Sequence, residues 1–298
     1  MFNKIIIYFL VLSLFAVAGT SREDEKQSSK ITKSVERTSE KTIYADITLG
    51  NGVIYLGKGS KGKIFDGEFI YSTNIPDINY EVIGDEGRLT IRFDDDEFKE
   101  KGKEKKFTSL SSLDNLYENE CHLKLTPDIP ISLNVELGVV KGELKLGGLQ
   151  LKEISFSSGV NKTFIDFDEP NPILLDYFDV EAGVGVLKMY NLGNANFRRF
   201  NFEGGIGEYV LDFAGNKYDN SRVDIDVGLG KVKLYLPQSS GVRMKVDKSF
   251  LCSFDIDDIY KKDDFYYNEN WGKTENSMDM NIETGVGNIS VVWIKDQE

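Results

Sequence analysis

Groups that commonly perform acid–base or nucleophilic catalysis are scarce in this sequence. Its 298 residues include a single histidine, His122, and two cysteines. His122 follows Cys121 in a run typical of a β-strand, where neighbouring side chains point to opposite faces, so the two cannot form a nucleophile–base pair. No serine stands in a nucleophile-elbow pattern, and the ligands for a zinc site are too few. The sequence therefore predicts a protein that is not an enzyme and uses no metal or other cofactor.

Basic residues and long apolar runs are also in short supply. Lysine and arginine number 36 against 49 acidic residues, which gives a formal net charge of −13. Proteins that bind nucleic acid draw much of their affinity from Lys and Arg that neutralise phosphates, so the charge argues against a nucleic-acid partner. It argues equally against anionic polysaccharide or acidic lipid as the main target. Only residues 5–15 form a long apolar run, and no second stretch reaches the length of a membrane-spanning helix.

The one apolar run has the form of a secretion signal. Lys4 precedes the run, Ala16-Val17-Ala18 follows it as an A-x-A cleavage pattern, and polar residues begin at Thr20. The run is shorter than a spanning helix, and no cysteine follows it for lipid attachment. We expect residues 1–18 to be removed on export. The mature chain would then have no membrane span and would lie in the periplasm or the extracellular cell envelope.

A polar segment separates this signal from the rest of the chain. Residues 19–42 contain five serines and eleven charged residues but no aromatic residue. Such a composition cannot offset the entropy of ordering by burying apolar surface. The sequence predicts a flexible linker over residues 19–42 and a folded domain over residues 43–298.

The domain contains one pattern of alternating apolar residues, repeated with an interruption at the same place. In the clearest copy, apolar residues take every second position of 223–229, skip across Gly230 and Lys231, and alternate again over 232–236. Period two is typical of a strand with one buried face, and the slip needs a bend that glycine allows. Five further copies and a weaker early one cover residues 133–146, 154–167, 178–189, 200–213, 278–293 and 45–56.

The spacing of the copies predicts that they stack. The residue between the corner glycines recurs at positions 139, 160, 184, 206 and 229, in steps of 21, 24, 22 and 23 residues. Such periods mark repeats in which each unit buries its apolar face against its neighbours. We expect an all-β solenoid of six to seven two-stranded coils with Gly-x-Gly corners. The last step, from 229 to 286, is 57 residues, so about one and a half coils are inserted or one coil lacks its corner.

An insertion over residues 238–277 carries the best candidate for a binding surface. Its aromatic residues stand among many Asp, Asn and Lys residues, and Phe265, Tyr266, Tyr267 and Trp271 are the selected candidates. Exposed aromatic rings beside polar groups are typical of a recognition patch. The alternative, which the sequence favours, is that they cover the open end of the solenoid, because repeat arrays need caps over bare strand edges.

The two cysteines leave a second choice open. Disulfides persist in exported proteins, and a Cys121–Cys252 bridge would close a loop of about 130 residues. In the chain-entropy model such a bridge stabilises the fold by on the order of 4–5 kcal/mol. The alternative is two separate buried thiols, since cysteine is among the most buried residue types.

Several short runs of the sequence are distinctive: Pro170-Asn171-Pro172, Leu192-Gly193-Asn194-Ala195-Asn196, Glu203-Gly204-Gly205-Ile206-Gly207 and Gly285-Val286-Gly287. With these runs, the sequence from about Tyr80 to Trp293 resembles the toast-rack family. That family is similar in turn to solenoid domains of cell-wall-active-antibiotic response proteins and of adhesin-like proteins. The resemblance implies a solenoid fold and brings no catalytic residues.

Together these features predict a non-enzymatic, adhesin-like protein that binds or scaffolds at the cell envelope, with a protein or another envelope component as its partner. One alternative is a regulator that contacts an envelope-stress signalling partner. The other is a glycan-active enzyme, which would need converging carboxylates and basic residues across several coils.

Overall fold

The computed structural model describes residues 28–72, 74–93, 119–215 and 220–295. Strands dominate these residues, and a short 3-10 helix at Leu192–Ala195 (η2) is the one helical element among them. Within the same ranges, no helix has the length and apolar character to cross a membrane. The expected signal segment, residues 1–18, lies outside the described residues.

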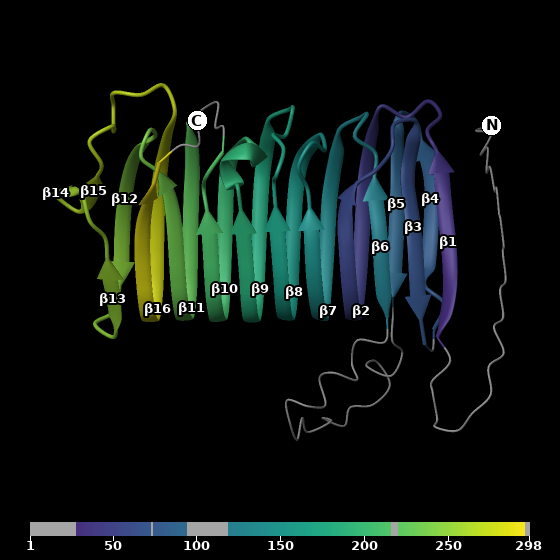
Figure 1. The fold of residues 1–298 in the computed structure, drawn as a ribbon, viewed down its shortest axis with the longest axis horizontal. Helices are drawn as coiled ribbons and strands as arrows, with labels where there is room; N and C mark the ends of the chain where they lie inside the picture. The colour runs from purple at the N-terminus through teal and green to yellow at the C-terminus, as the bar shows by residue number, and fades with distance from the viewer. Residues whose placement is uncertain (1–27, 73, 94–118, 216–219, 296–298) are drawn as a thin grey trace, which may run out of the picture.

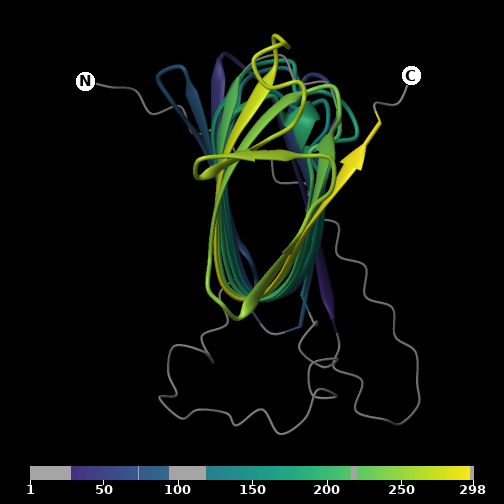
Figure 2. The ribbon, with the colours of Figure 1, turned by 90° about the vertical axis from the view of Figure 1, so that its left-hand side faces the viewer.

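Long bent strands form the body of the molecule. They pair in parallel in the order β2-β7-β8-β9-β10-β11-β16 and lie side by side in Figure 1. Viewed end-on, each strand curves around the lower edge, so that its two halves face each other across the core (Figure 2). The predicted solenoid is confirmed, although each coil is one continuous bent strand. These strands are β2 (Thr42–Lys58), β7 (Ile131–Lys145), β8 (Leu151–Asp166), β9 (Leu175–Tyr190), β10 (Phe197–Asp212), β11 (Ser221–Pro237) and β16 (Ser277–Ile294).

The slip in the sequence pattern marks the bend of each coil. Ile206 pairs with Val184 on one side and with Leu229 on the other, and the row continues through the remaining coils. Neighbouring coils approach each other closely at the glycines that directly follow Ile206 and Leu229. A Cβ atom added to Gly230 would lie 2.0 Å from the backbone oxygen of Gly207. The corner of β11 therefore needs glycine at position 230 because there is no space for a side chain, whereas the corners of β7 and β8 carry Val140 and Asn161 in the same row.

The coils at both ends of the stack are divided into two strands. At one end, β5 (Glu86–Phe93) pairs with the first half of β2 and β6 (Glu120–Leu125) with its second half. At the other end, β12 (Gly241–Lys248) and β13 (Cys252–Asp255) pair with the two halves of β16. The long step in the sequence therefore contains a coil without a corner. This coil stacks outside β16 although it precedes β16 in the chain.

Antiparallel strands cover the edges of these divided coils. β4 (Asp77–Ile83) pairs with β5, and β3 (Lys63–Tyr71) pairs with β6. At the C-terminal end, β15 (Phe265–Tyr267) pairs with β12, and β14 (Tyr260–Lys262) pairs with β15. The edges of β5, β6 and β12 are thereby protected from pairing with other chains.

One of the edge strands corrects an expectation. The sequence predicts a flexible linker over residues 19–42, but Ser29–Glu36 forms strand β1, which pairs antiparallel with β3. Its side chains are exposed or only partly buried, so backbone pairing orders it more than apolar burial does. An exposed ion pair between Lys30 and Glu68, 2.7 Å apart, joins the two strands.

The space between the two walls of the solenoid is filled by aromatic and aliphatic side chains. The rings of Phe178 and Phe200 meet edge-to-face at 5.2 Å, and those of Phe200 and Phe213 at 5.9 Å. Such contacts add stability beyond the burial of the ring area. Consecutive coils therefore share one continuous core.

The two cysteines lie far apart in the order of strands. Cys121 is in β6 and Cys252 is in β13, which are in the divided coils at opposite ends of the stack. Both are buried and free. The structure thus shows two separate thiols and no bridge between them. Burial raises the pKa of the Cys121 thiol to about 12, so it stays protonated and unreactive at neutral pH.

Candidate functional site

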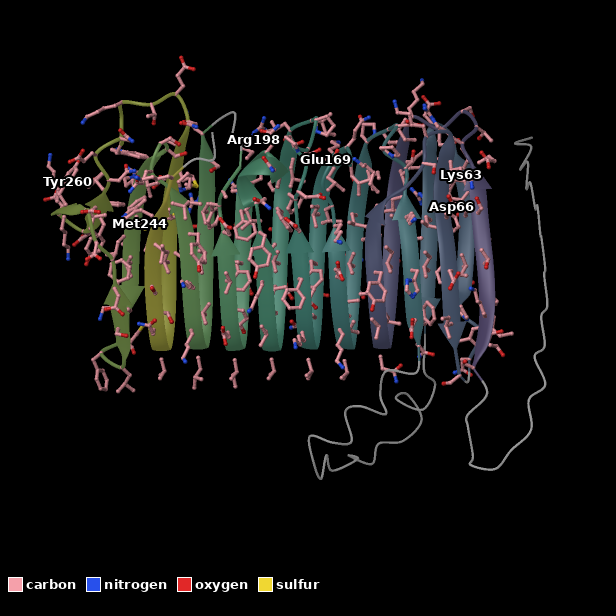
Figure 3. The ribbon with its side chains drawn as sticks, in the orientation of Figure 1. Lys63, Asp66, Glu169, Arg198, Met244 and Tyr260 are labelled. Atoms are coloured by element: carbon pink, nitrogen blue, oxygen red, sulfur yellow. The ribbon has the colours of Figure 1, made fainter. Side chains whose placement is uncertain are left out.

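A groove of about 420 Å³ crosses the outer face of the strands that precede the corners. We call it the arginine–aromatic groove. Arg198, labelled in Figure 3, lies in its wall well above the lower edge of the solenoid. The lining residues are Asp176, Tyr177, Arg198, Arg199, Asn220, Ser221, Arg222, Trp271, Ser277 and Asp279.

Strand register brings the groove's side chains into one row. Arg199 pairs with Tyr177 on one side and with Arg222 on the other. Arg222 pairs with Asp279, which pairs in turn with Arg243. Because neighbouring strands lie about 4.8 Å apart, their outward side chains form a continuous row. The chain contains eight arginines, and four of them gather here: Arg198, Arg199, Arg222 and Arg243.

Three of these arginines are paired with carboxylates. Arg198 lies 3.3 Å from Asp176, Arg222 lies 2.8 Å from Asp224, and Arg243 forms an ion pair with Asp279. The hydrogen bond to Asp279 raises the pKa of Arg243 and keeps it charged. The groove is thus a surface of mixed charge within a strongly acidic chain.

Arg199 is placed differently. Its guanidinium lies over the ring of Tyr177, 5.8 Å from the ring centre, and half of the Tyr177 side chain is exposed. A cation over an aromatic ring is attracted by the negative face of the ring. Arg199 and Tyr177 therefore present to solvent a flat surface that combines a polar guanidinium with an apolar ring.

The aromatic residues that the sequence selects lie on both sides of β15. Phe265, Tyr267 and Trp271 are partly buried on the outer side, and Trp271 lines the groove. The Arg243 guanidinium lies 5.0 Å from the ring centres of both Phe265 and Trp271. Tyr267 contacts Trp271, with the ring centres 6.3 Å apart. Arg243 thus links these aromatic residues to the row of arginines.

Tyr266 faces the opposite way. It is partly buried against the core, and its ring meets that of Phe254 edge-to-face at 5.3 Å. Alternate residues of a strand point to opposite faces, so β15 offers one side to the core and one to the groove. Tyr266 thus helps to cover the end of the solenoid, while Phe265 and Tyr267 lie on the outer side of the same short strand, where the recognition surface stays a prediction.

Replacing Trp271 by alanine should lower the free energy of unfolding by about 1–2 kcal/mol, because a half-buried ring loses its contacts with Tyr267 and Arg243. Replacing Tyr266, which packs against the core, by alanine should lower the free energy of unfolding by about 2–4 kcal/mol. Denaturant unfolding of both variants measures the difference. A larger loss for Trp271→Ala would show that Trp271 seals the solenoid end.

Sequence reasoning missed Tyr177, Arg199, Arg222 and Asp279. A signal was available: Tyr177, Arg199 and Arg222 each directly precede the first apolar residue of their copy of the repeat, and Asp279 directly precedes Met280, the second apolar residue of its copy. Aligning the copies would have placed them in one row. The repeat is defined by its apolar positions, so it does not reveal which exposed residues of different copies become neighbours.

The remaining chemistry-bearing residues lie outside the groove. His122 stacks on Tyr55, with the ring centres 4.6 Å apart, and its Nε2 lies 3.0 Å from a Glu120 carboxylate oxygen. Cys121 is in the core, on the opposite side of β6. Among the described residues, no group of three or more His, Cys, Asp or Glu side chains is arranged to hold a metal ion.

The fold and this surface define a β-solenoid protein that displays rows of side chains from stacked, bent strands. The family described as "N-terminal domain of toast_rack, DUF2154" matches residues 23–190, more than half of the chain. The chain therefore belongs to the toast-rack family. No curated protein matches its sequence.

The chain is also similar to solved structures. A candidate cell adhesion protein from Clostridium sporogenes ATCC 15579 is 25% identical, with a TM-score of 0.47 over 91% of this chain and 100% of that one. A candidate adhesin from Bacteroides fragilis NCTC 9343 is 15% identical, with a TM-score of 0.37 over 89% and 97%. A candidate lipid-binding protein from Parabacteroides distasonis ATCC 8503 is 11% identical, with a TM-score of 0.30 over 88% and 96%.

Proposed function

We propose that this chain is a non-enzymatic, adhesin-like protein that binds or scaffolds at the cell envelope through the arginine–aromatic groove. The observation that carries the proposal is the in-register row in which Tyr177, Arg199 and Arg222 lead toward Trp271. Tryptophan, tyrosine and arginine contribute most of the binding energy in many protein interfaces. Here strands of a stacked sheet hold most of them, so little conformational freedom is lost on binding.

The charges of the groove point to the chemistry of the partner. Asp176, Asp224 and Asp279 balance three arginines. A surface of mixed charge fits a partner that offers donors, acceptors and apolar area together, such as a protein or an uncharged envelope component. A polyanion would meet three carboxylates among the four arginines of this surface.

The two carboxylates that line the groove do not have the spacing of a glycosidase pair. Asp176 is in β9 and Asp279 is in β16, which are separated by three strand spacings. Three spacings correspond to about 14 Å. The two carboxylates of a glycosidase lie about 5–9.5 Å apart, so this pair is too widely spaced. Both carboxylates also lie in ion pairs with arginines.

The proposed location rests on the N-terminal sequence. Lys4, the apolar run over residues 5–15 and Ala16-Val17-Ala18 form an export signal. N-terminal sequencing of the exported protein should give a chain that begins near Gly19. A chain that still begins at Met1 would show that this segment is not cleaved and acts as a membrane anchor.

A matched pair of double variants tests the proposed contact surface. Arg199→Ala/Arg222→Ala removes two arginines from the groove. The control, Arg88→Ala/Arg92→Ala, removes the same charge at the other end of the stack, where Arg88 pairs with Glu86. Binding is measured by co-sedimentation with envelopes isolated from the organism that makes the protein.

The groove variant should bind at least about tenfold more weakly than the wild type, since each hot-spot side chain contributes about 1–2 kcal/mol or more. The control should bind like the wild type. Equal binding by all three proteins would exclude the groove as the contact surface.

A further inference from the structure

A second surface lies along the lower edge of the solenoid. The residue at the apex of each bend projects outward there, and Figure 3 shows a row of side chains along this edge. We call this row the aliphatic ridge. Its members and their exposed fractions are Val160 (44%), Val184 (46%), Ile206 (53%), Leu229 (47%) and Val286 (39%).

The fold alone does not require aliphatic residues at these positions. A side chain at the apex of each corner points into solvent, where a polar residue would be hydrated. Instead, consecutive coils from β8 to β16 each place an aliphatic residue in the same register. At about 4.8 Å per strand, the ridge is about 20 Å long. Contiguous exposed apolar surface is typical of an interaction site.

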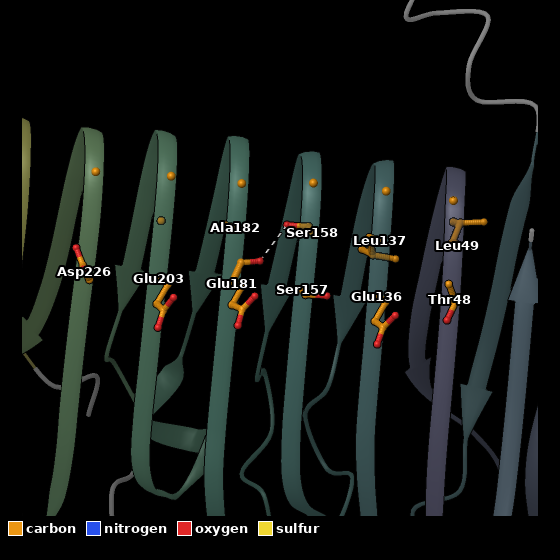
Figure 4. A pocket seen from close by; sticks show the side chains of 17 residues that line it. Thr48, Leu49, Glu136, Leu137, Ser157, Ser158, Glu181, Ala182, Glu203 and Asp226 are labelled. Atoms are coloured by element: carbon orange, nitrogen blue, oxygen red, sulfur yellow. Dashed lines mark hydrogen bonds between the residues drawn. The ribbon is translucent and has the colours of Figure 1, made fainter. Parts of the chain in front are cut away.

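A trough of about 740 Å³ runs beside the ridge. Glycines such as Gly183 and Gly205 form part of its lining and leave it without side chains next to the ridge. On the far side of the trough, Glu136, Ser157, Glu181, Glu203 and Asp226 stand in one row on successive strands (Figure 4). The trough therefore has one aliphatic bank and one acidic bank.

The carboxylates of the acidic bank repel one another. Glu203 faces Glu181 and Asp226 on the neighbouring strands, and all three are exposed. None of them forms an ion pair with another residue of the described ranges. Like charges on adjacent strands are unfavourable. Lys162 and Lys231 lie beyond the ridge, on the strand halves that follow the corner, so they do not line the trough.

We propose that the ridge and the trough bind an amphipathic helix of a partner protein, with a row of Lys or Arg residues beside a row of aliphatic residues. The aliphatic row of the helix would pack against the ridge, and its basic row would neutralise the acidic bank. This surface is separate from the arginine–aromatic groove, so the inference goes beyond the proposed function.

The dimensions of the trough fit a helix. Its lining extends from Thr48 in β2 to Asp226 in β11, which spans five strand spacings, or about 24 Å. A helix rises about 1.5 Å per residue, so about 16 residues cover this length. One helical turn rises about 5.4 Å, which is close to the distance between coils. The acidic bank would repel the anionic headgroups of a lipid surface.

The test uses a synthetic helical peptide of about 16 leucine and lysine residues, arranged amphipathically, and a scrambled peptide of the same composition. Dissociation constants are measured by calorimetry with the mature chain. Ile206→Asn/Leu229→Asn removes part of the ridge without changing charge. Glu181→Gln/Glu203→Gln removes two carboxylates from the bank, and Asp257→Asn/Asp258→Asn removes the same charge elsewhere.

We expect the amphipathic peptide to bind at least about tenfold more tightly than the scrambled one. The ridge variant and the bank variant should each lose at least about tenfold in affinity, while the control changes less than about twofold. Melting temperatures and light scattering report whether the variants remain folded. Retained folding with lost binding supports the proposal.

Four outcomes would overturn the proposal. The first is no measurable binding of either peptide. The second is equal weakening by the control variant, which would show attraction to net charge alone. The third is binding to anionic vesicles that the ridge variant abolishes, which would make the ridge a membrane contact. The fourth is a wild-type dimer that the ridge variant dissociates, which would make the occupant a second copy of the chain.

Discussion

Replacing Gly230 by valine should lower the free energy of unfolding by more than about 3 kcal/mol. A Cβ atom at this position would lie 2.0 Å from the oxygen and 3.0 Å from the carbonyl carbon of Gly207. Both are backbone atoms, so no flexible side chain can move aside. The coils on both sides pair with β11, and the displacement would spread through the stack. Denaturant unfolding followed by circular dichroism measures the loss.

Two further variants separate close approach from backbone strain. Gly84 has a φ of +63° and no atom within 4 Å of an added Cβ, so Gly84→Ala should cost only about 1–2 kcal/mol. Gly207→Ala tests close approach alone, because its added Cβ would lie 2.2 Å from the oxygen of Gly185. A wild-type midpoint for Gly230→Val would show that the corner of β11 does not need glycine.

The corners could be predicted because both of their signals are local in sequence. Alternation of period two identifies the strand halves, and the glycine after Leu229 identifies the bend between them. The placement of β16 between β11 and β12 has no such signal. It depends on pairing between distant segments, which alternation within each segment does not specify. Strand β1 was missed for a related reason, since it is held by pairing with β3 and buries little.

The two candidate surfaces differ in how far the sequence could predict them. Trp271 and its aromatic neighbours stand out by composition, whereas Arg199 and Arg222 become neighbours only through the register of β10 and β11. The aliphatic ridge could not be predicted from alternation, because alternation assigns the apolar residues of a strand to its buried face. Ile206 and Leu229 occupy the bend itself, where that rule no longer holds.

Replacing Asn171 by leucine should lower the free energy of unfolding by about 3 kcal/mol or more, the second large effect that we expect. The Asn171 side chain is buried, and its Nδ2 donates to the oxygens of Leu151 and Ala195 at 2.8 and 3.1 Å. The backbone N–H of Leu151 donates to Asn171 Oδ1 at 3.0 Å. Leucine has a similar size but satisfies none of these three buried groups. Each unsatisfied group costs about 1–3 kcal/mol.

A matched control is the same substitution at Asn201, whose side chain donates to Asp179 on the outer face of the solenoid. There water can replace the lost partner, so Asn201→Leu should change stability by no more than about 0.5–1 kcal/mol. Urea unfolding of both variants gives the two midpoints. Equal midpoints would mean that the bonds of Asn171 do not hold adjacent coils together. A much lower midpoint for Asn171→Leu alone would show that this one amide couples three coils, through Leu151 on one side and Ala195 on the other.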